Sequence, residues 1–241
     1  MKIAKESEVE RISLELLEDL KKKLAGINYV VIGGWALTAY AGNIRYTKDI
    51  DMLVKHTEKD ALIQGFDHTQ FNVKESKFGV RAKHNDTGIE IHVTAGEKAH
   101  DESTKTGIKV PNRIFMEGNI GEVSGLYCKT KRVSIPVCDL EYFAVLKGIP
   151  DLAKHDFDFV MLLTNPLHLG RKEVRINSQR FTSLLKTCVL NLKPFREKEK
   201  RIRDKQNFQR IGNSVTPPVF FDNARYRRVL LALDEIDKFL K

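Results

Sequence analysis

Two short apolar runs, separated by a glycine pair and a helix-compatible segment, organise the N-terminal half of the chain. Tyr29–Ile32 ends in Gly33-Gly34, and the second run covers residues 49–54. Apolar runs of this length are typical of buried strands, and a glycine pair allows a tight turn. We interpret the stretch as strand, glycine turn, short helix over residues 35–40, turn and strand.

The spacing of apolar residues predicts further elements on both sides of this stretch. Val9, Ile12, Leu16 and Leu20 recur at helical intervals, and residues 94–125 have weak periodicity, typical of a long loop with a short helix near 112–116. The same criteria predict helices over 6–25, 58–64, 140–147 (capped by Asp139), 151–163, from 177 to Pro194, and 223–239; they predict strands over 71–75, 79–84, 89–93, 126–129 and 133–137. Residues 197–210 suit either a solvated helix or a mobile segment.

The distribution of these elements indicates two domains. Strands and helices alternate up to Asn165-Pro166, where proline interrupts the helical pattern. Beyond that point only helices are predicted. We therefore expect an α/β (α+β) core domain over residues 1–165, with a sheet flanked by helices, and a helical C-terminal domain over residues 166–241.

Composition restricts where the protein acts. The chain has 241 residues and 41% hydrophobic content, enough for a substantial core, but no run of eighteen apolar residues. The N-terminus becomes charged at once, unlike a signal peptide. The three cysteines lack metal-ligand spacing, which suits free thiols in a reducing compartment. We expect a cytoplasmic protein without a membrane segment.

The positive charge of the chain is concentrated in one stretch. The formal net charge is +9, and residues 171–210 contain 13 Lys and Arg against 4 Asp and Glu. Such a local excess attracts polyanions and favours RNA as a partner. The alternative is a solvated face that only keeps the protein soluble, since few aromatic residues accompany the charges.

Candidate chemistry centres on two acids in the second apolar run. Asp49 and Asp51 are two residues apart on a predicted strand, so both side chains leave the same face. At about 4 Å and an effective dielectric of about 20, their repulsion is roughly 4 kcal/mol. A divalent cation between them would remove this repulsion, and carboxylates suit Mg²⁺. Alternatively, water solvates two surface acids.

The diglycine followed by Asp-x-Asp in an apolar strand resembles the nucleotidyltransferase signature of the DNA polymerase β-like superfamily, and the fuller pattern resembles the AbiEii-type minimal nucleotidyltransferases. The lincosamide and aminoglycoside nucleotidyltransferases share this core. The resemblance implies a nucleotidyltransferase-type mixed sheet and transfer of a nucleoside monophosphate from an NTP to a hydroxyl group. It implies Mg²⁺ (or Mn²⁺) at Asp49 and Asp51, with the amides of Gly33-Gly34 and the hydroxyl of Thr47 at the phosphates.

The resemblance also implies a third carboxylate on a later strand, and Ile89-Glu90-Ile91 fits that pattern. Glu90 would complete the metal site and help to deprotonate the attacking hydroxyl. Glu90 could instead face solvent, and Asp86, in a turn, is the second candidate. His92 shares the face of Glu90, either as a polar neighbour or as a substrate contact.

Three cations, Arg45, Lys48 and Lys147, complete the candidate site. Arg45 and Lys48 could steady the leaving pyrophosphate or be surface charges. The resemblance places Lys147 at the nucleotide phosphates, although a helical lysine is often only solvated. Lys154 and Asp158 match polar positions of the family, but His155 stands where the family usually has Asp, which leaves the role of this cluster open.

The acceptor is the least determined part. The AbiEii-type resemblance implies a toxin that modifies RNA, such as tRNA bound through residues 171–210, or protein, and an antitoxin partner. Two alternatives remain open: a small-molecule (antibiotic) nucleotidyltransferase and a catalytically silent nucleic-acid-binding module.

Overall fold

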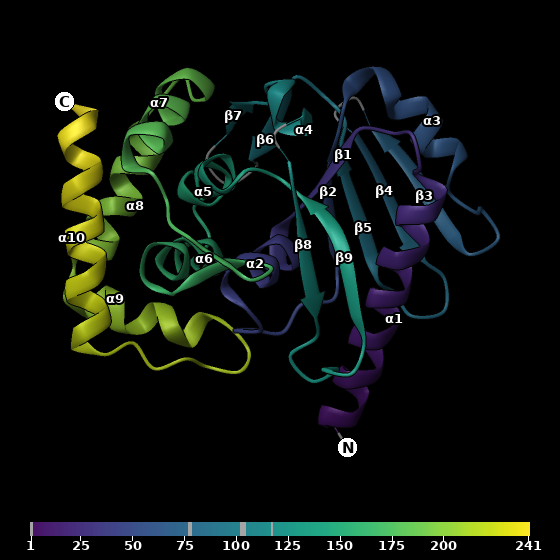
Figure 1. Cartoon of the computed structure of the whole chain (residues 1–241), viewed down its shortest axis with the longest axis horizontal. Coiled ribbons are helices and arrows are strands. Elements are labelled where there is room, and N and C mark those ends of the chain that lie inside the picture. Colours follow the sequence, from purple (N-terminus) through teal and green to yellow (C-terminus); the bar gives the residue numbers. More distant parts are fainter. Residues whose placement is uncertain (1, 77–78, 102–104, 117) are drawn as a thin grey trace. The chain divides into compact units, whose positions relative to one another are not determined.

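The computed structural model describes residues 2–76, 79–101, 105–116 and 118–241, and the chain forms two compact units (Figure 1). Unit 1 comprises Met1–Ala99, Val110–Cys138 and His168–Lys172, and unit 2 comprises His100–Lys109, Asp139–Leu167 and Glu173–Lys241. This division differs from the predicted domain boundary at residue 165, because Asp139–Leu167 belongs to unit 2 together with the C-terminal helices.

A seven-stranded mixed sheet forms the centre of unit 1, in the order β3-β4-β5-β2-β1-β9-β8. Its strands are β1 (Tyr29–Ile32), β2 (Ile50–Val54), β3 (Phe71–Ser76), β4 (Gly79–His84), β5 (Glu90–Thr94), β8 (Asn119–Ser124) and β9 (Arg132–Val137). β1 runs antiparallel to β2, whereas β5 runs parallel to β2 and β9 parallel to β1. The mixed α/β fold expected from the sequence is confirmed.

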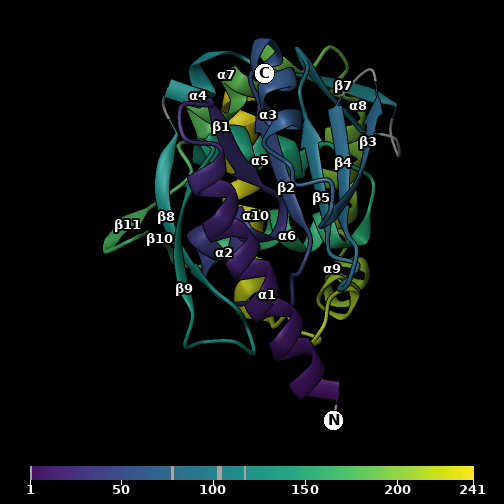
Figure 2. The ribbon, with the colours of Figure 1, turned by 90° about the vertical axis from the view of Figure 1, so that its right-hand side faces the viewer.

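Two helices matter most for the candidate site in unit 1. α1 (Lys2–Lys23) lies across one face of the sheet (Figure 2), and α2 (Gly33–Ala41) follows β1 directly. α1 is amphipathic as expected, but Leu14 and Leu17 are more deeply buried than Val9 and Ile12. Shorter helical segments of this unit are η1 (His56–Glu58), α3 (Lys59–Gln64) and α4 (Arg113–Met116).

Residues 94–125 contain more regular structure than expected. β6 (Lys98–Asp101) pairs with β7 (Thr106–Lys109), and β8 occupies Asn119–Ser124. The hairpin around residue 131 is confirmed, but the strand over 126–129 is wrong. The carboxylate of the buried Glu10 on α1 accepts the backbone N–H groups of residues 126, 127 and 128 at 2.7–3.1 Å, so these amides cannot join a strand ladder.

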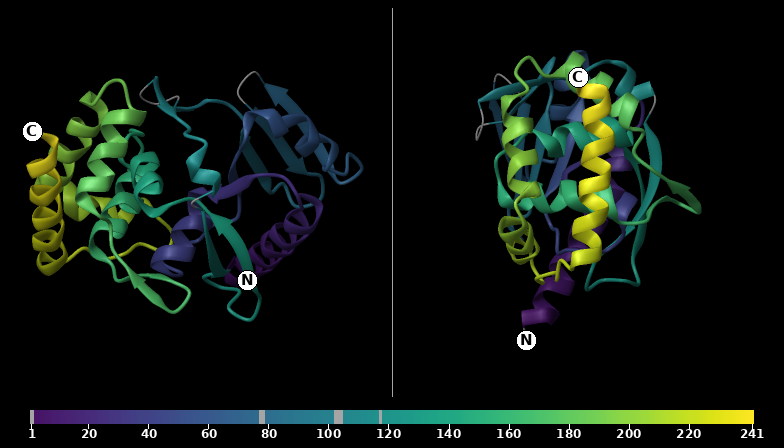
Figure 3. Two further views of the ribbon diagram at one scale, coloured as in Figure 1. Left: turned by 45° about the horizontal axis from the view of Figure 1, so that its top comes forward. Right: turned by 90° about the vertical axis from the view of Figure 1, so that its left-hand side faces the viewer.

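Unit 2 is a helical body built around aromatic residues. The rings of Phe159, Phe181 and Phe195 meet with centroids 5.8–6.0 Å apart. α10 packs along α7 (Figure 3). The helices are α5 (Leu140–Gly148), α6 (Ala153–Thr164), α7 (Ser178–Cys188), α8 (Lys193–Arg203), α9 (Lys205–Ile211), η2 (Gly212–Ser214) and α10 (Asn223–Leu240), and a hairpin of β10 (Leu167–Leu169) and β11 (Lys172–Val174) follows α6.

Two expectations for this region change. Pro194 does not end a helix but stands in the first turn of α8, where a proline is tolerated because its missing N–H has no helical acceptor. The charged segment 197–210 forms α8 and α9 and is partly buried: Lys198 is inaccessible to solvent and donates to Asp156 at 2.5 Å. No helix in the described part of the chain combines the length and hydropathy that crossing a membrane requires.

Candidate functional site

An imidazole joins two carboxylates on neighbouring strands of unit 1. Asp51 of β2 and His92 of β5 are partners in the parallel register. His92 Nδ1 lies 3.2 Å from Asp51 Oδ1, and its Nε2 lies 2.8 Å from Glu90 Oε2. The three side chains are each about one third exposed, at 32–36%. The group is therefore fixed by the sheet yet open to solutes.

Asp49 reaches the same place from the segment before β2. Its Oδ1 accepts the backbone N–H of Glu90 at 3.1 Å, so it anchors the first residue of β5. Asp49 precedes the strand rather than lying in it. Asp49 thus contacts the backbone of Glu90, and Asp51 and Glu90 are linked through His92, while a shared metal site of the three acids stays a prediction. Asp86, the second candidate, is exposed in the turn before β5.

The two glycines permit a close approach between α2 and this acidic group. Gly33 has φ +70°, and a Cβ there would collide with the carboxylate of Asp51. A Cβ on Gly34 would collide with Oγ1 of the buried Thr47. Both glycines belong to the first turn of α2, whose N–H groups have no acceptor within the helix. Such a helix start, beside carboxylates, is a place where a phosphate with its counter-cation can bind.

A small polar network fixes the loop that carries Asp49. The buried Ser13 of α1 donates to the carbonyl of Lys48 at 2.5 Å and accepts the indole N–H of Trp35 at 3.2 Å. It therefore ties α1 and α2 to the segment before β2. This role of Ser13 was not predicted, although a serine between Ile12 and Leu14 on a helix is a signal of a polar contact inside the core.

The imidazole changes the titration of its neighbours. Its hydrogen bond to Glu90 lowers the pKa of that carboxyl below the usual 4.5. The hydrogen bond that His92 donates to Asp51 raises the pKa of His92 above 6.5, against the effect of burial, which lowers it. His92 was expected to be either a polar neighbour or a substrate contact. The structure shows a polar bridge between the acids.

Cations surround the acidic group in unit 1. The Nη1 atom of Arg45 lies beside Gly34 and donates to the carbonyl of Tyr46 at 3.3 Å. Lys48 Nζ is 3.8 Å from Asp49 Oδ1. Arg81 on β4, which the sequence analysis missed, has its Nε 4.0 Å from Glu90 Oε2. The signal for Arg81 is its place opposite His92 in the β4–β5 register, which the sequence alone does not provide.

Lys147 belongs to unit 2 and is buried there. Its Nζ pairs with Asp158 Oδ2 at 2.8 Å and lies 3.4 Å from Nδ1 of His155. Burial and the charge of Lys147 lower the pKa of His155 to about 2, so this imidazole stays neutral. Lys154 is exposed. Lys147, His155 and Asp158 thus form one buried cluster, while the contact of Lys147 with nucleotide phosphates stays a prediction.

The donor chemistry of the acidic group suits a hard divalent cation. Asp49, Asp51 and Glu90 offer only carboxylate oxygens, which Mg²⁺ prefers. As the side chains stand, however, no three His, Cys, Asp or Glu residues within the described ranges are arranged to hold a metal ion. His92 is hydrogen-bonded between Asp51 and Glu90, so a protonated imidazole supplies positive charge there.

A comparison with known protein families identifies the family of the chain. Residues 14–157, more than half of the chain, match the family model described as aminoglycoside-2''-adenylyltransferase. The chain belongs to this family. The matched region contains the diglycine, all three acids and Lys147. As a member of the aminoglycoside-2''-adenylyltransferase family, the chain is a nucleotidyltransferase. The superfamily that the sequence resemblance implied is supported, whereas the narrower AbiEii-type assignment is not confirmed.

The chain resembles several solved structures at low sequence identity. The nucleotidyltransferase toxin MenT4 of Mycobacterium tuberculosis is 15% identical with a TM-score of 0.51, over 96% of this chain and 85% of that one. JHP933 of Helicobacter pylori is 15% identical with a TM-score of 0.49, over 93% and 90%. The antibiotic-resistance factor ANT(2'')-Ia is 13% identical with a TM-score of 0.49, over 83% and 99%. A comparison with curated protein sequences found no match.

Proposed function

We propose that the chain transfers a nucleoside monophosphate from an NTP to a hydroxyl group of RNA, with Asp49, Asp51 and Glu90 as catalytic residues. The observation that carries the transfer reaction is the meeting of these acids at the first turn of α2. In the reaction, the acceptor oxygen forms a bond to the α-phosphorus. The bond from that phosphorus to the bridging oxygen of pyrophosphate breaks, and pyrophosphate leaves.

Each residue of the candidate site has a specific task in this proposal. Glu90 accepts the proton of the attacking hydroxyl. The N–H groups of Gly33-Gly34 and the hydroxyl of Thr47 bind phosphate oxygens. Arg45 and Lys48 stabilise the negative charge of the leaving pyrophosphate.

Asp49, Asp51 and Glu90 would hold Mg²⁺ or Mn²⁺, since all three offer the oxygen ligands that these ions take. The bound ion would polarise the phosphate oxygens and screen the triphosphate from the carboxylates. His92 orients Asp51 and Glu90 before substrate binds, because it contacts both.

RNA as the acceptor rests on the exposed cations of unit 2. At least seven of the thirteen basic residues in 171–210 pair with acids, and these are Arg175, Arg180, Lys193, Arg196, Lys198, Arg201 and Arg203. Lys200, Lys205 and Arg210 are exposed and have no acidic partner among the described residues. These three residues on α8 and α9 supply positive charge for phosphate contacts. If the protein is a toxin that modifies RNA, an antitoxin protein in the cytoplasm would be its partner.

A second candidate is adenylylation of an aminoglycoside, which the family model favours. Aminoglycosides are polycations, so this acceptor would require carboxylates that the nucleotide and its ion leave unused. It would not require Lys200, Lys205 or Arg210. The two candidates therefore differ in the acceptor alone and share the same acidic group.

The test uses purified protein with each of the four α-labelled NTPs, Mg²⁺, and either total RNA or an aminoglycoside panel. We expect label in RNA that ribonuclease releases and protease does not. Asp49→Asn should abolish labelling with an unchanged circular dichroism spectrum, whereas the matched control Asp86→Asn should keep it. Label on an aminoglycoside instead would establish the second candidate, and full activity of the Asp49 variant would refute the site.

A further inference from the structure

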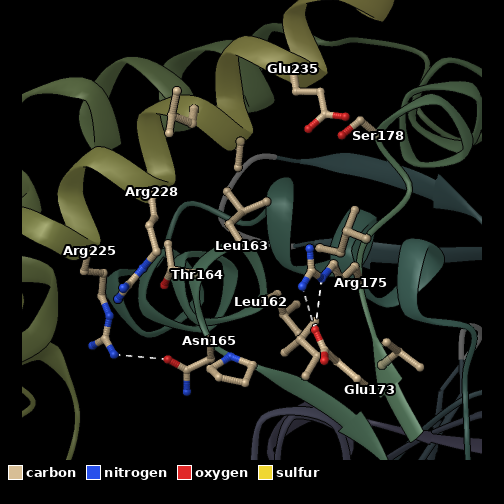
Figure 4. Close-up of a pocket in the computed structure, with 16 residues that line it drawn as sticks. Leu162, Leu163, Thr164, Asn165, Glu173, Arg175, Ser178, Arg225, Arg228 and Glu235 are labelled. Atoms are coloured by element: carbon tan, nitrogen blue, oxygen red, sulfur yellow. Dashed lines mark hydrogen bonds and ion pairs between the residues drawn. The ribbon is translucent and has the colours of Figure 1, made fainter.

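A pocket of about 540 Å³ within unit 2 is lined by none of the residues of the proposed reaction. It is enclosed by the end of α6, the segment from β11 to α7, and α10 (Figure 4). Its volume falls in the range of small-molecule sites, about 300–1,000 Å³. None of its lining residues has a task in nucleotidyl transfer.

Two arginines of α10 make one end of this pocket cationic. Figure 4 shows Arg225 and Arg228 reaching from α10 toward Thr164 and Asn165 at the end of α6. Arg225 donates from Nη2 to Asn165 Oδ1 at 3.1 Å, and its guanidinium carbon lies 5.0 Å from the centre of the Phe221 ring. A guanidinium held in this way keeps a fixed direction for its remaining N–H groups.

Neither arginine forms an ion pair with an acid among the residues that the structure describes. The Nε atom of Arg225 is buried and has no hydrogen-bond partner in the described part of the chain. Asp222, an acid three residues before Arg225, accepts the backbone N–H of Arg225 at 2.7 Å as the N-cap of α10. Burial and the charge of Arg228 both lower the pKa of Arg225, as expected for two cations that face each other without a carboxylate between them.

The rest of the pocket lining is mixed: it contains apolar side chains, the ion pair of Glu173 with Arg175 and, farther along α10, Glu235. Leu163 and Leu231 line it, and Leu231 is 70% exposed although it is a large apolar side chain. Glu235 lies two helical turns after Arg228, about 10 Å along α10. It stands beside Ser178 at the other end of the pocket (Figure 4). An anionic group is therefore attracted to the arginine end and repelled from the opposite end.

We propose that this pocket binds a small amphiphilic oxyanion, a carboxylate or phosphate monoester with an apolar tail. The anionic group takes the free N–H groups of Arg225 and the guanidinium of Arg228, and the tail covers Leu163 and Leu231. Two adjacent guanidiniums suit the bidentate geometry of either oxyanion. The apolar tail replaces water over the exposed leucine.

The test is calorimetric titration of the full chain with octanoate and with octyl phosphate, which separates the carboxylate from the phosphate source. Octanol and octyltrimethylammonium are the neutral and cationic controls. We expect at least one of the two oxyanions to bind, and we expect octanol and octyltrimethylammonium to bind at least about tenfold more weakly. Equal binding of octanol, or no binding of either oxyanion, would overturn the proposal.

Variants on the same helix make the test specific. Arg228→Gln should weaken binding of the oxyanion about tenfold or more, because it removes one guanidinium. Arg227→Gln is the matched control: this arginine is exposed on α10 but does not line the pocket. Both variants should keep the wild-type circular dichroism spectrum and labelling activity. An equal loss of binding in both variants would reduce the effect to the general charge of α10 and refute the pocket.

Discussion

His92 and Glu90 stand two residues apart on β5, on the same face of the sheet, with Nε2 of the imidazole 2.8 Å from Oε2 of the carboxylate. The other ring nitrogen of His92 faces Asp51 at 3.2 Å. A neutral imidazole has one N–H, so it can donate to only one of two carboxylates, whereas an imidazolium donates to both. The arrangement therefore favours the protonated form, and its contribution to stability depends on pH.

The first prediction concerns the pH range of that contribution. The pKa of His92 is raised above 6.5, so its stabilisation is complete below 6.5 and is lost as the pH rises through the raised pKa. The pKa of Glu90 is lowered below 4.5, so its stabilisation is complete above 4.5 and is lost as the pH falls through the lowered pKa. The bridge should be strongest between 4.5 and 6.5. Urea unfolding in EDTA at several pH values gives the difference in free energy of unfolding between the wild type and His92→Gln. A difference that does not change with pH would contradict the prediction.

The second prediction is the size of the coupling between the two side chains. All members of the bridge are about one third exposed, so water weakens the interaction. We expect a coupling of about 1 kcal/mol between His92→Ala and Glu90→Gln near pH 6. A double-mutant cycle in urea gives the value. Additive effects of the two substitutions would show that the hydrogen bond contributes nothing to folding.

The third prediction separates two reasons for glycine at positive φ. Gly33 and Gly42 have φ +70° and +79°, but only at Gly33 would a Cβ collide with another residue, Asp51. Gly42→Ala should cost about 1–3 kcal/mol, the strain of an L-residue at a φ of 79° and a ψ of −172°. Gly33→Ala should cost more and also abolish nucleotidyl transfer, because Asp51 must move. Chemical denaturation and the labelling assay measure both, and similar losses in the two variants would refute the contact argument.

Features that depend on local sequence patterns were predictable, whereas features that depend on distant partners were not. The diglycine, Asp49, Asp51 and Glu90 could be found because each lies within or beside a short apolar run. The loss of a strand at 126–128 could not, since its cause is the carboxylate of Glu10, more than a hundred residues earlier. Long-range partners of this kind leave no periodic signal.

The positive charge that a partner can reach is likewise not predictable from the sequence alone. Counting residues 171–210 indicates a large basic surplus, but Arg203 pairs with Asp234 and Asp237 of α10, and Arg201 pairs with Asp151 before α6. Those acids lie outside the counted stretch. The charge available to a partner is therefore smaller than the sequence indicates, and only tertiary structure identifies the residues that provide it.

The fourth prediction follows from the buried pair of Lys198 and Asp156. Lys198 is fully buried with its Nζ 2.5 Å from Asp156 Oδ1. Removing the lysine leaves a buried carboxylate with only Arg201 nearby, so Lys198→Met should cost about 3 kcal/mol or more. The exposed neighbour Lys200→Met should change stability by less than about 0.5 kcal/mol. Urea unfolding decides, and equal effects of both substitutions would contradict the burial of this charge.

The last prediction tests the RNA acceptor through salt. Lys200, Lys205 and Arg210 are exposed on α8 and α9. Each phosphate contact with single-stranded RNA contributes about −0.7 to the slope of log K against log salt, so replacing all three by Gln should make the slope about 2 units less steep. Replacing Arg175, which pairs with Glu173, together with Lys193, which pairs with Glu197, serves as the control for general charge loss, because these cations already have acidic neighbours. Fluorescence anisotropy with a labelled RNA at several salt concentrations provides both slopes. If the triple variant keeps the wild-type slope, RNA does not contact this surface, and adenylylation of a small cationic acceptor becomes the better explanation of the acidic group.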